Sequence, residues 1–504
     1  MRALLMFPDR DFDSKLEQNS NIKDLIQDLE METILSAMAK GDDLVFKVSS
    51  AVVLSSSSND KNTILWRQEI LKDCLNHEDS IRRLYEITSE PIKIRKSMFL
   101  ISAGQHPSLM LSDGRRILEA LNGVLGKLYS FALKEKDNFK SEGLKNFCLM
   151  LIDQLAPEYL SEMKKHLSAL HFENGILFSA KLGIGNTGKD FVTRFFAPER
   201  WAWLKDLIKD TPPHYRFSID PRDESGAREV GELRDEVLKD IAVSVMQASK
   251  HVESFFGMLR TELAFYVGCL NLNNTLRDKS CPIFIPEISS IPCTLRFEDL
   301  RDVALSLSLQ TPAVGNDLDI TATPVVLVTG ANQGGKSTFL RSVGSAHMMF
   351  QAGMFVAARQ YEADLRDGVF THYRRREDKD LNSGKFDEEL CRMDEIISQV
   401  QKAPLVLFNE SFAATNEREG SEVARQIIMG LAQANGHVIF VTHMYALAES
   451  FINQSTLKTC FLRANRDDSG QRSFKILSGK PELTSFGKDL YNKIFLEKTS
   501  SDNV

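Results

Sequence analysis

Residues 329–338 read Thr-Gly-Ala-Asn-Gln-Gly-Gly-Lys-Ser-Thr, which contains the pattern G-x-x-x-x-G-K-[S/T] of a phosphate-binding P-loop. An apolar run from Pro324 to Val328 precedes the motif and predicts a buried strand, and a helical pattern follows from Phe339. In this context glycines allow backbone N–H groups to face phosphate, and the helix presents its positive N-terminal end. The stretch therefore predicts a nucleoside triphosphate site.

Individual residues of this motif have separate predicted roles. Lys336 supplies a point charge for the outer phosphates, and Ser337 is placed to bind Mg²⁺. An ordinary glycine-rich turn is the alternative, and the flanking strand and helix disfavour it. The predicted nucleotide-binding residues are Gly330, Asn332, Gly334, Gly335, Lys336, Ser337 and Thr338.

A second apolar run, residues 404–408, ends in Asn409-Glu410. P-loop ATPases place Asp-Glu here: the first residue holds Mg²⁺ or its water, and the glutamate acts as base toward the attacking water. The Asn409 amide accepts a bond from a metal-bound water but brings no negative charge. The predicted metal ligands are Ser337, Asn409 through water, and Glu410. Nucleotide binding is therefore better supported than the Mg²⁺ affinity or the hydrolysis rate.

A third strand-like run, residues 437–441, ends in Thr442-His443. A histidine here suits sensing of the γ-phosphate or orientation of water, whereas an isolated histidine would be structural. The predicted catalytic residues are Glu410, His443 and Lys336.

The segment 380–386 contains a Ser383-Gly384 turn before a helix. Such a turn can present N–H groups and a hydroxyl to phosphate. ATPases of the ABC type use a segment of this kind in trans, so we predict that Ser383 contacts the nucleotide of a second subunit. A plain loop is the alternative.

Composition fits a multidomain globular protein. The chain has 504 residues, 43% of them hydrophobic and 26% charged, which is ordinary for globular proteins. The net charge of −7 decides little about nucleic acid, because phosphate binding requires a local basic surface. Basic runs occur at 92–96 and 373–376, and a solvated face is their alternative. Scattered cysteines and the lack of a bilayer-length apolar run predict a cytoplasmic protein, nucleoid-associated in a bacterium.

Periodicity divides the chain into a helical part and an α/β part. Apolar residues step by three or four from Glu229 to about Leu270, which predicts a lever-like helix; a packing stripe in a bundle is the equal alternative. Residues 172–226, rich in turn signals, predict a small inserted module with some strand. The predicted domains are 1–282, a helical core and lever with the 172–226 insertion, and 283–504, an ATPase domain with a mostly parallel sheet.

Together these segments resemble the DNA mismatch-repair MutS family of ATPases. Residues 329–338 are close to that family's T-G-P-N-M-G-G-K-S-T, and Asn409-Glu410 with Thr415 and Gly420 looks like its D-E-x-G-R-G-T-x-x-x-x-G segment. Further similar segments are Thr442-His443, the loop at Ser383, Ser485-Phe486-Gly487 and the helical stretch 66–75.

The resemblance implies a multidomain α and α/β fold. A long-helix core and lever with a small clamp-like module would precede an ABC-like ATPase domain that dimerises. It implies ATP and Mg²⁺ as cofactors. It also implies double-stranded or branched DNA, a homodimer and repair proteins as partners, and no membrane. The expected function is ATP hydrolysis in a composite site that switches a DNA clamp, in mismatch repair or recombination.

Several departures from the family qualify this expectation. The N-terminal segment is too short for the mismatch-recognition domain, with its Phe-x-Glu wedge, and for the connector domain, so distorted or branched duplex is the expected target. Asn409 replaces the usual Asp. Ala313 stands just before Val314-Gly315-Asn316, where the family often stacks an aromatic residue on adenine. Three alternatives remain: an ATPase that regulates a protein partner without DNA, a nearly inactive nucleotide-binding scaffold dimer, and the less favoured ABC transporter subunit.

Overall fold

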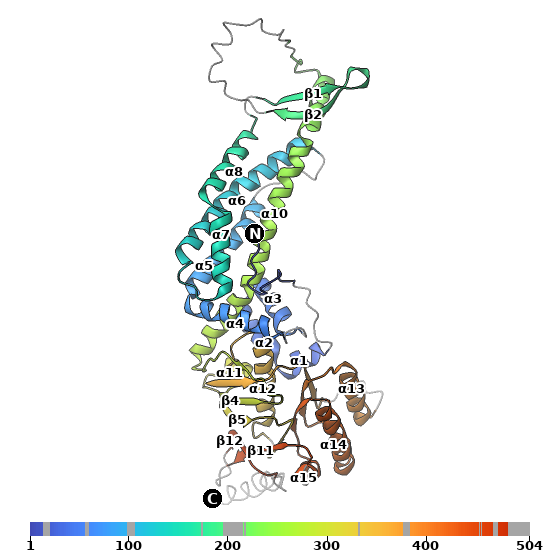
Figure 1. Ribbon diagram of the computed structural model, residues 1–504. Helices are drawn as coiled ribbons and strands as arrows, with labels where there is room; N and C mark the ends of the chain where they lie inside the picture. Colours follow the sequence, from blue (N-terminus) through green and yellow to red (C-terminus); the bar gives the residue numbers. More distant parts are fainter. Residues whose placement is uncertain are drawn as a thin grey trace, which may run out of the picture. The chain divides into compact units, whose positions relative to one another are not determined.

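The computed structural model describes residues 1–13, 21–55, 60–97, 106–172, 175–194, 215, 218–330, 333–375, 384–452, 454, 456–466 and 472–481. The chain forms two compact units. Unit 1 comprises Met1–Ala3, Arg82–Phe139 and Leu144–Arg260, and unit 2 comprises Leu4–Ile81, Lys140–Gly143 and Thr261–Val504. Each unit is described by itself below (Figure 1).

Unit 1 is built mainly from helices. They are α5 (Glu78–Ser97), α6 (Pro107–Glu135), α7 (Glu142–Gln154), α8 (Pro157–Ala169) and the first part of α10 (Glu224–Asp278). Leu111 of α6 packs with Leu238 and Ala242 of α10 in a small apolar core. Gly114 permits this approach, because a Cβ there would lie 3.1 Å from the Val245 side chain. The α6–α10 contact therefore rests on apolar burial and one small residue.

Helix α10 is longer than the sequence predicted. It runs unbroken for 55 residues, beyond both ends of the predicted 229–270 stretch, and rises about 80 Å at 1.5 Å per residue. Residues 224–260 belong to unit 1 and residues 261–278 to unit 2. The lever role remains a prediction.

The predicted strand content of 172–226 appears as an antiparallel hairpin in unit 1. Strand β1 (Leu177–Leu182) pairs with β2 (Gly188–Arg194), and the 3-10 turn η1 (Ile184–Asn186) joins them. Thr193 Oγ1 of β2 donates a hydrogen bond to the Val237 carbonyl of α10, at 3.3 Å. The hairpin is thus tied to the long helix.

Unit 2 contains α1 (Ile22–Asp28), α2 (Met31–Ala39), α3 (Asp43–Val53), α4 (Lys61–Asn76), α11 (Val303–Ser308), α12 (Lys336–Gln351), α13 (Lys385–Gln399), α14 (Glu417–Gln433) and α15 (Tyr445–Ile452). A four-stranded sheet has the order β3-β7-β4-β5, with β3 (Glu287–Ile288), β7 (Gln360–Ala363), β4 (Leu295–Leu300) and β5 (Asn316–Ile320). The sequence analysis did not predict this second sheet.

The main sheet of unit 2 has the order β12-β11-β6-β10-β9-β8. Its strands are β6 (Val325–Thr329), β8 (Gly368–Tyr373), β9 (Pro404–Asn409), β10 (His437–Val441), β11 (Thr459–Arg466) and β12 (Arg472–Ser478). All neighbours are parallel except the antiparallel pair β11–β12. The predicted strands at 324–329, 404–408 and 437–441 are confirmed, whereas β8 was missed. The sequence also predicts a short helix around residues 487–496, which lie outside the described residues.

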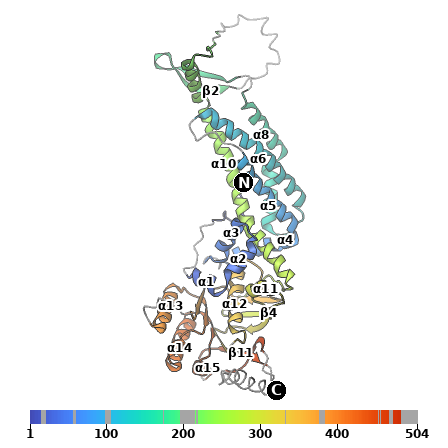
Figure 2. The same ribbon diagram turned by 180° about the vertical axis from the view of Figure 1, so that it is seen from behind.

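Helices cover both faces of this sheet. Phe408 and Phe440 stack with ring centroids 4.9 Å apart, in a core with residues of α13, α14 and α15. Those helices lie together beside the strands in the reverse view (Figure 2). Leu407 points to the other face, where a Cβ on Gly344 of α12 would lie 2.6 Å from it. Alternating side chains of one strand therefore serve two helical layers, which explains its continuous apolar sequence.

The first residues of unit 2 are buried with the C-terminal part of the chain. The Glu262 carboxylate of α10 accepts hydrogen bonds from the Leu5 N–H, at 2.7 Å, and the Phe12 N–H, at 3.0 Å. Tyr266 donates its hydroxyl to the Leu5 carbonyl at 2.6 Å. Residues 4–81 accordingly belong to the same compact unit as the P-loop. The limits of the two compact units do not coincide with the domain boundary predicted after residue 282. That boundary stays a prediction.

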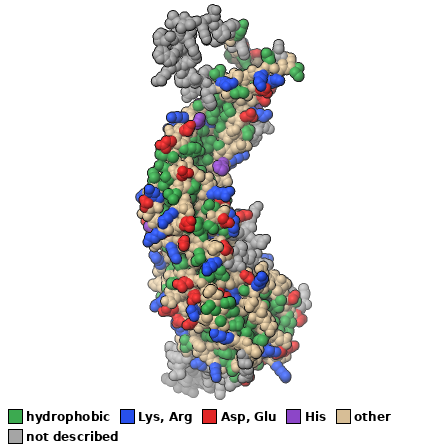
Figure 3. Space-filling model, in the orientation of Figure 1, with side chains coloured by type: hydrophobic (Ala, Val, Ile, Leu, Met, Phe, Trp, Pro, Cys, Tyr) green, Lys and Arg blue, Asp and Glu red, His purple; other side chains and the backbone are tan. Residues whose placement is uncertain are grey.

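Surface charge is mixed. Lys and Arg side chains are interspersed with Asp and Glu side chains over the face drawn in Figure 3. Of the predicted basic runs, Arg95 pairs with Glu253 within unit 1, and Arg375 pairs with Asp24 and Asp28 within unit 2. Part of each run is therefore engaged in internal ion pairs. No helix in the described part of the chain is both long and apolar enough to cross a membrane.

Candidate nucleotide site

The P-loop connects β6 to α12, as predicted. Gly330 has φ 115°, Gln333 has φ 59° and Gly335 has φ 91°, so the loop uses left-handed backbone that glycine adopts most readily. A Cβ on Gly330 would lie 3.0 Å from the Ala464 nitrogen, and one on Gly335 would lie 3.2 Å from the Phe474 oxygen. Both glycines are required by backbone conformation and by the β11–β12 hairpin packed against the loop.

Lys336 begins α12 and its side chain turns back into the loop. It is 4% exposed, and its ammonium Nζ donates to the Gly330 carbonyl at 2.7 Å. Burial lowers its pKa to about 8, and the negative charge of Glu410 opposes that shift. A partly desolvated cation at a helix N-terminus is well suited to an anionic ligand.

The predicted metal ligands Ser337 and Asn409 face each other. The Ser337 hydroxyl donates to the Asn409 amide oxygen at 3.0 Å. Two oxygens from different elements thus meet beside the P-loop, which is the donor chemistry that Mg²⁺ prefers. The residues fit Mg²⁺ held mainly by phosphate and water, because both oxygens are neutral. No cluster of three His, Cys, Asp or Glu side chains suited to a metal occurs among the described residues.

Glu410 and His443 form the third pair. His443 Nε2 lies 2.7 Å from Glu410 Oε1, and the two side chains are 29% and 31% exposed. The hydrogen bond from His443 holds the pKa of Glu410 below its usual value, and burial acts in the opposite direction. Glu410 is therefore an ionised, partly exposed carboxylate that is hydrogen-bonded to His443.

Sheet topology brings these pairs together. Strands β6, β10 and β9 are parallel neighbours, so the residues that follow them meet at one edge of the sheet. The P-loop follows β6, His443 follows β10, and Glu410 follows β9. Gly334 is buried in the loop and Thr338 is half-buried in the first turn of α12. The predicted residues Asn332 and Ser383 lie outside the described residues.

The loop at Ala313 is structural. Ala313 is 5% exposed. A Cβ on Gly315 would collide with Asp299 at 1.8 Å, and the Asn316 side-chain oxygen accepts a hydrogen bond from the Ile476 N–H at 2.7 Å. The segment therefore ties β5 to β12, and its buried alanine offers no aromatic face to a base.

Sequence reasoning missed the support that β11 and β12 give to the P-loop. Besides the contacts with Gly330 and Gly335, Thr329 Oγ1 donates to the Leu462 carbonyl at 3.3 Å. Two strand-like segments, 457–462 and 473–477, predict strands in the tail, but no local signal indicates which strand they would join.

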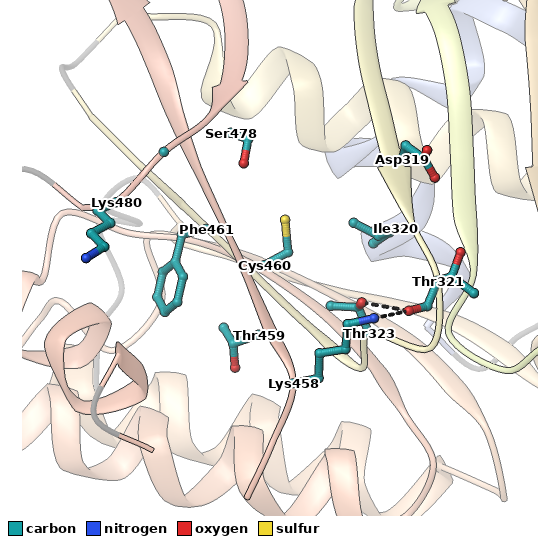
Figure 4. A pocket seen from close by; sticks show the side chains of 11 residues that line it. Asp319, Ile320, Thr321, Thr323, Lys458, Thr459, Cys460, Phe461, Ser478 and Lys480 are labelled. Carbon is teal, nitrogen blue, oxygen red and sulfur yellow. Dashed lines mark hydrogen bonds between the residues drawn. The ribbon is translucent and has the colours of Figure 1, made fainter. Parts of the chain in front are cut away.

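A pocket of about 450 Å³ lies at the amino-terminal ends of β6 and β11. Figure 4 shows Thr323 and Thr459, at the starts of β6 and β11, on its wall. Lys458 Nζ donates to the Thr321 carbonyl at 2.6 Å. The pocket contains none of the predicted site residues, which follow the opposite, carboxyl ends of β6, β9 and β10.

Comparison with known proteins agrees with this geometry. A model described as the MutS2 N-terminal domain matches residues 59–279, and one described as MutS domain V matches residues 326–497. The chain is similar to a DNA mismatch repair protein MutS of Thermus thermophilus, 28% identical over 38% of this chain and 23% of that protein. It is also similar to the DNA mismatch repair protein MSH3 of Arabidopsis thaliana, 23% identical over 84% of this chain and 39% of that protein. The chain thus spans roughly a quarter of the length of the first of these relatives and two-fifths of the length of the second. The P-loop, Glu410 and His443 meet at one end of the sheet, and MutS models match residues 59–279 and 326–497, so the chain belongs to the MutS family.

Proposed function

We propose that the chain binds and hydrolyses ATP at the carboxyl edge of β6, β10 and β9, and that a second subunit completes the site through Ser383. One observation carries the proposal: two hydrogen-bonded pairs join segments that are far apart in sequence. Ser337 lies 3.0 Å from Asn409, and Glu410 lies 2.7 Å from His443.

Each pair has a role in the proposed reaction. Lys336 exchanges its bond to the Gly330 carbonyl for the outer phosphates. Glu410 accepts a proton from the attacking water, and His443 holds the Glu410 carboxylate in place. Ser337, Asn409 through water and Glu410 would hold Mg²⁺, which supplies charge neutralisation at the phosphates when bound. Because Asn409 is neutral, we expect weaker metal binding than with an Asp at this position.

The DNA-binding part of the proposal rests on the β1–β2 hairpin of unit 1. Its tip is apolar and exposed: Leu182 is 75% exposed and Ile184 is 99% exposed. Lys181 and Lys189 flank this tip. Cations contact phosphates, and an exposed apolar tip suits a groove or a distorted base step. We propose that the hairpin contacts duplex or branched DNA and that ATP turnover switches this contact through α10.

Steady-state ATPase activity tests the proposal. Turnover should be measured with and without linear, mismatched and four-way-junction DNA at a stated salt concentration, alongside a direct DNA-binding assay. Stimulation by DNA, with DNA affinity that depends on the bound nucleotide, is expected because coupling is reciprocal. ATPase activity with no DNA response and no DNA binding at low salt would favour regulation of a protein partner. ATP binding without turnover would favour the scaffold dimer.

A further inference from the structure

The turn that carries Glu410 has an unusual backbone. Glu410 has φ 56° and Phe412 has φ 62°. Left-handed backbone is unfavourable for a non-glycine residue, and it persists only where the surroundings hold it. Three buried groups from β8, α13 and the turn itself surround this segment.

His372, at the end of β8, contacts both Ser411 in the turn and Glu389 in α13. Its Nε2 lies 3.0 Å from the Glu389 carbonyl oxygen, and its Nδ1 lies 2.7 Å from Ser411 Oγ. A carbonyl only accepts, so Nε2 carries the ring proton. Burial lowers the pKa of His372 to about 4, so the ring is neutral near pH 7 and Nδ1 accepts from the Ser411 hydroxyl.

The Ser411 hydroxyl has a second acceptor. Its Oγ also lies 2.6 Å from the His372 carbonyl oxygen, so one proton faces two acceptors of the same residue. The His372 ring stacks on Phe412, with centroids 5.2 Å apart and planes at 16°. Both residues that follow Glu410 are therefore held by His372.

Glu389 attaches the same turn to α13. Its side chain is buried, and its carboxyl group accepts a hydrogen bond from the Phe412 N–H. Burial raises the pKa of this carboxyl group, and among the described residues its Oε2 has no hydrogen-bond partner. Helix α13 thus contacts the turn twice, directly through the Glu389 side chain and through His372 by the Glu389 carbonyl.

We propose that His372, Ser411 and Glu389 are positioning residues through which helix α13 sets the orientation of the Glu410 carboxylate. The proposal rests on the proposed ATPase function. Among the described residues, the hydrogen bonds of His372 and Ser411 run to each other and to α13, and none runs to the P-loop. A shift of α13, which begins at Lys385 close in sequence to Ser383, would consequently change turnover while leaving nucleotide affinity intact.

The test measures ATP affinity and kcat of full-length Ser411→Ala and Glu389→Ala. We expect kcat to fall roughly ten- to a hundredfold, because a base displaced by about 1 Å loses this much, with the ATP Kd changed less than about twofold. Ser411→Thr keeps the hydroxyl and should restore most of the rate. If Glu389→Ala does not fold, Ser411→Ala carries the test, since it removes a single oxygen atom.

A double-mutant cycle separates positioning from general destabilisation. In a Glu410→Gln background, Ser411→Ala should cause no further slowing, because it acts through the Glu410 carboxylate. Slowing by the same factor in both backgrounds would overturn the inference. His437→Gln is the matched control: His437 is another buried histidine, at the start of β10, and its loss should lower stability without changing kcat of the folded protein.

Two results distinguish the inference from the function on which it rests. If Glu410→Gln slows the wild-type ATPase but Ser411→Ala and Glu389→Ala both match wild type, only the positioning inference fails. If the wild-type chain hydrolyses no ATP, or Glu410→Gln leaves the rate unchanged, the proposed site itself fails.

Discussion

The carboxyl edge of the main sheet and the β1–β2 hairpin are opposite kinds of surface. At the sheet edge, Lys336, Ser337 and Glu410 each have a partner within 3.0 Å. At the hairpin tip, Leu182 and Ile184 are largely exposed, and the neighbouring Lys181 pairs with Asp190 of the same hairpin at 3.2 Å. Catalysis requires groups that are oriented before the substrate arrives, whereas exposed apolar side chains indicate a surface for a partner. Changes at the edge should therefore alter rate and nucleotide affinity, and changes at the hairpin should alter only binding of the partner.

Removing the P-loop cation should have the largest effect. Lys336→Ala deletes the charge at the start of α12, and a charge-assisted hydrogen bond is worth roughly 1.5–3 kcal/mol, so ATP affinity should fall roughly ten- to more than a hundredfold. Titration calorimetry measures this. Lys402→Ala, an exposed lysine just before β9, is the control and should bind like wild type. Retained affinity in Lys336→Ala would refute the P-loop assignment.

Removing the base should separate binding from turnover. Glu410→Gln keeps the size of the side chain and loses the carboxylate, so ATP should bind normally while turnover slows at least about tenfold. Single-turnover hydrolysis provides the measurement, and Glu395→Gln, on the exposed side of α13, is the control. A wild-type rate in Glu410→Gln would show that another group takes the proton.

The pKa of Lys336 predicts a pH dependence of binding. In the free protein this ammonium group has a pKa of about 8 because of burial, and phosphate contact should raise it. Above about pH 8, ATP binding must then take up a proton, so affinity should fall by up to about tenfold for each further pH unit. Calorimetry in buffers of different ionisation enthalpy measures the uptake directly. No proton uptake at pH 8.5 would contradict the prediction.

The smallest effects are expected at the hairpin. Lys189→Ala should weaken DNA binding evenly across sequences and reduce the salt slope by about one. Ile184→Ser should weaken binding to distorted duplex by a few-fold, about the value of one lost apolar contact, and leave thermal stability and basal ATPase activity unchanged because Ile184 is 99% exposed. Unchanged DNA affinity in both variants would move the DNA contact away from the hairpin.

Much of the site was predictable, because its parts have local signatures. The glycine spacing predicted the P-loop, and the apolar runs that end in Asn409-Glu410 and Thr442-His443 predicted the ends of two strands. The hairpin was foreseen only as some strand within 172–226. The support beneath Glu410 was not predicted, since His372 lies on β8, a strand that the sequence analysis missed, and no local pattern singled out Glu389.

The sequence by itself determined the chemistry of this protein: a phosphate loop, a lysine, a glutamate and a histidine after buried strands, and one very long helix. Only the tertiary structure decided which residues meet. Ser337 reaches Asn409, Glu389 reaches Phe412, and Glu262 holds the Leu5 and Phe12 backbone. The physical reason is the strand order β12-β11-β6-β10-β9-β8, which differs from the order along the chain. Local periodicity encodes which face of an element is buried, but not which distant element covers it.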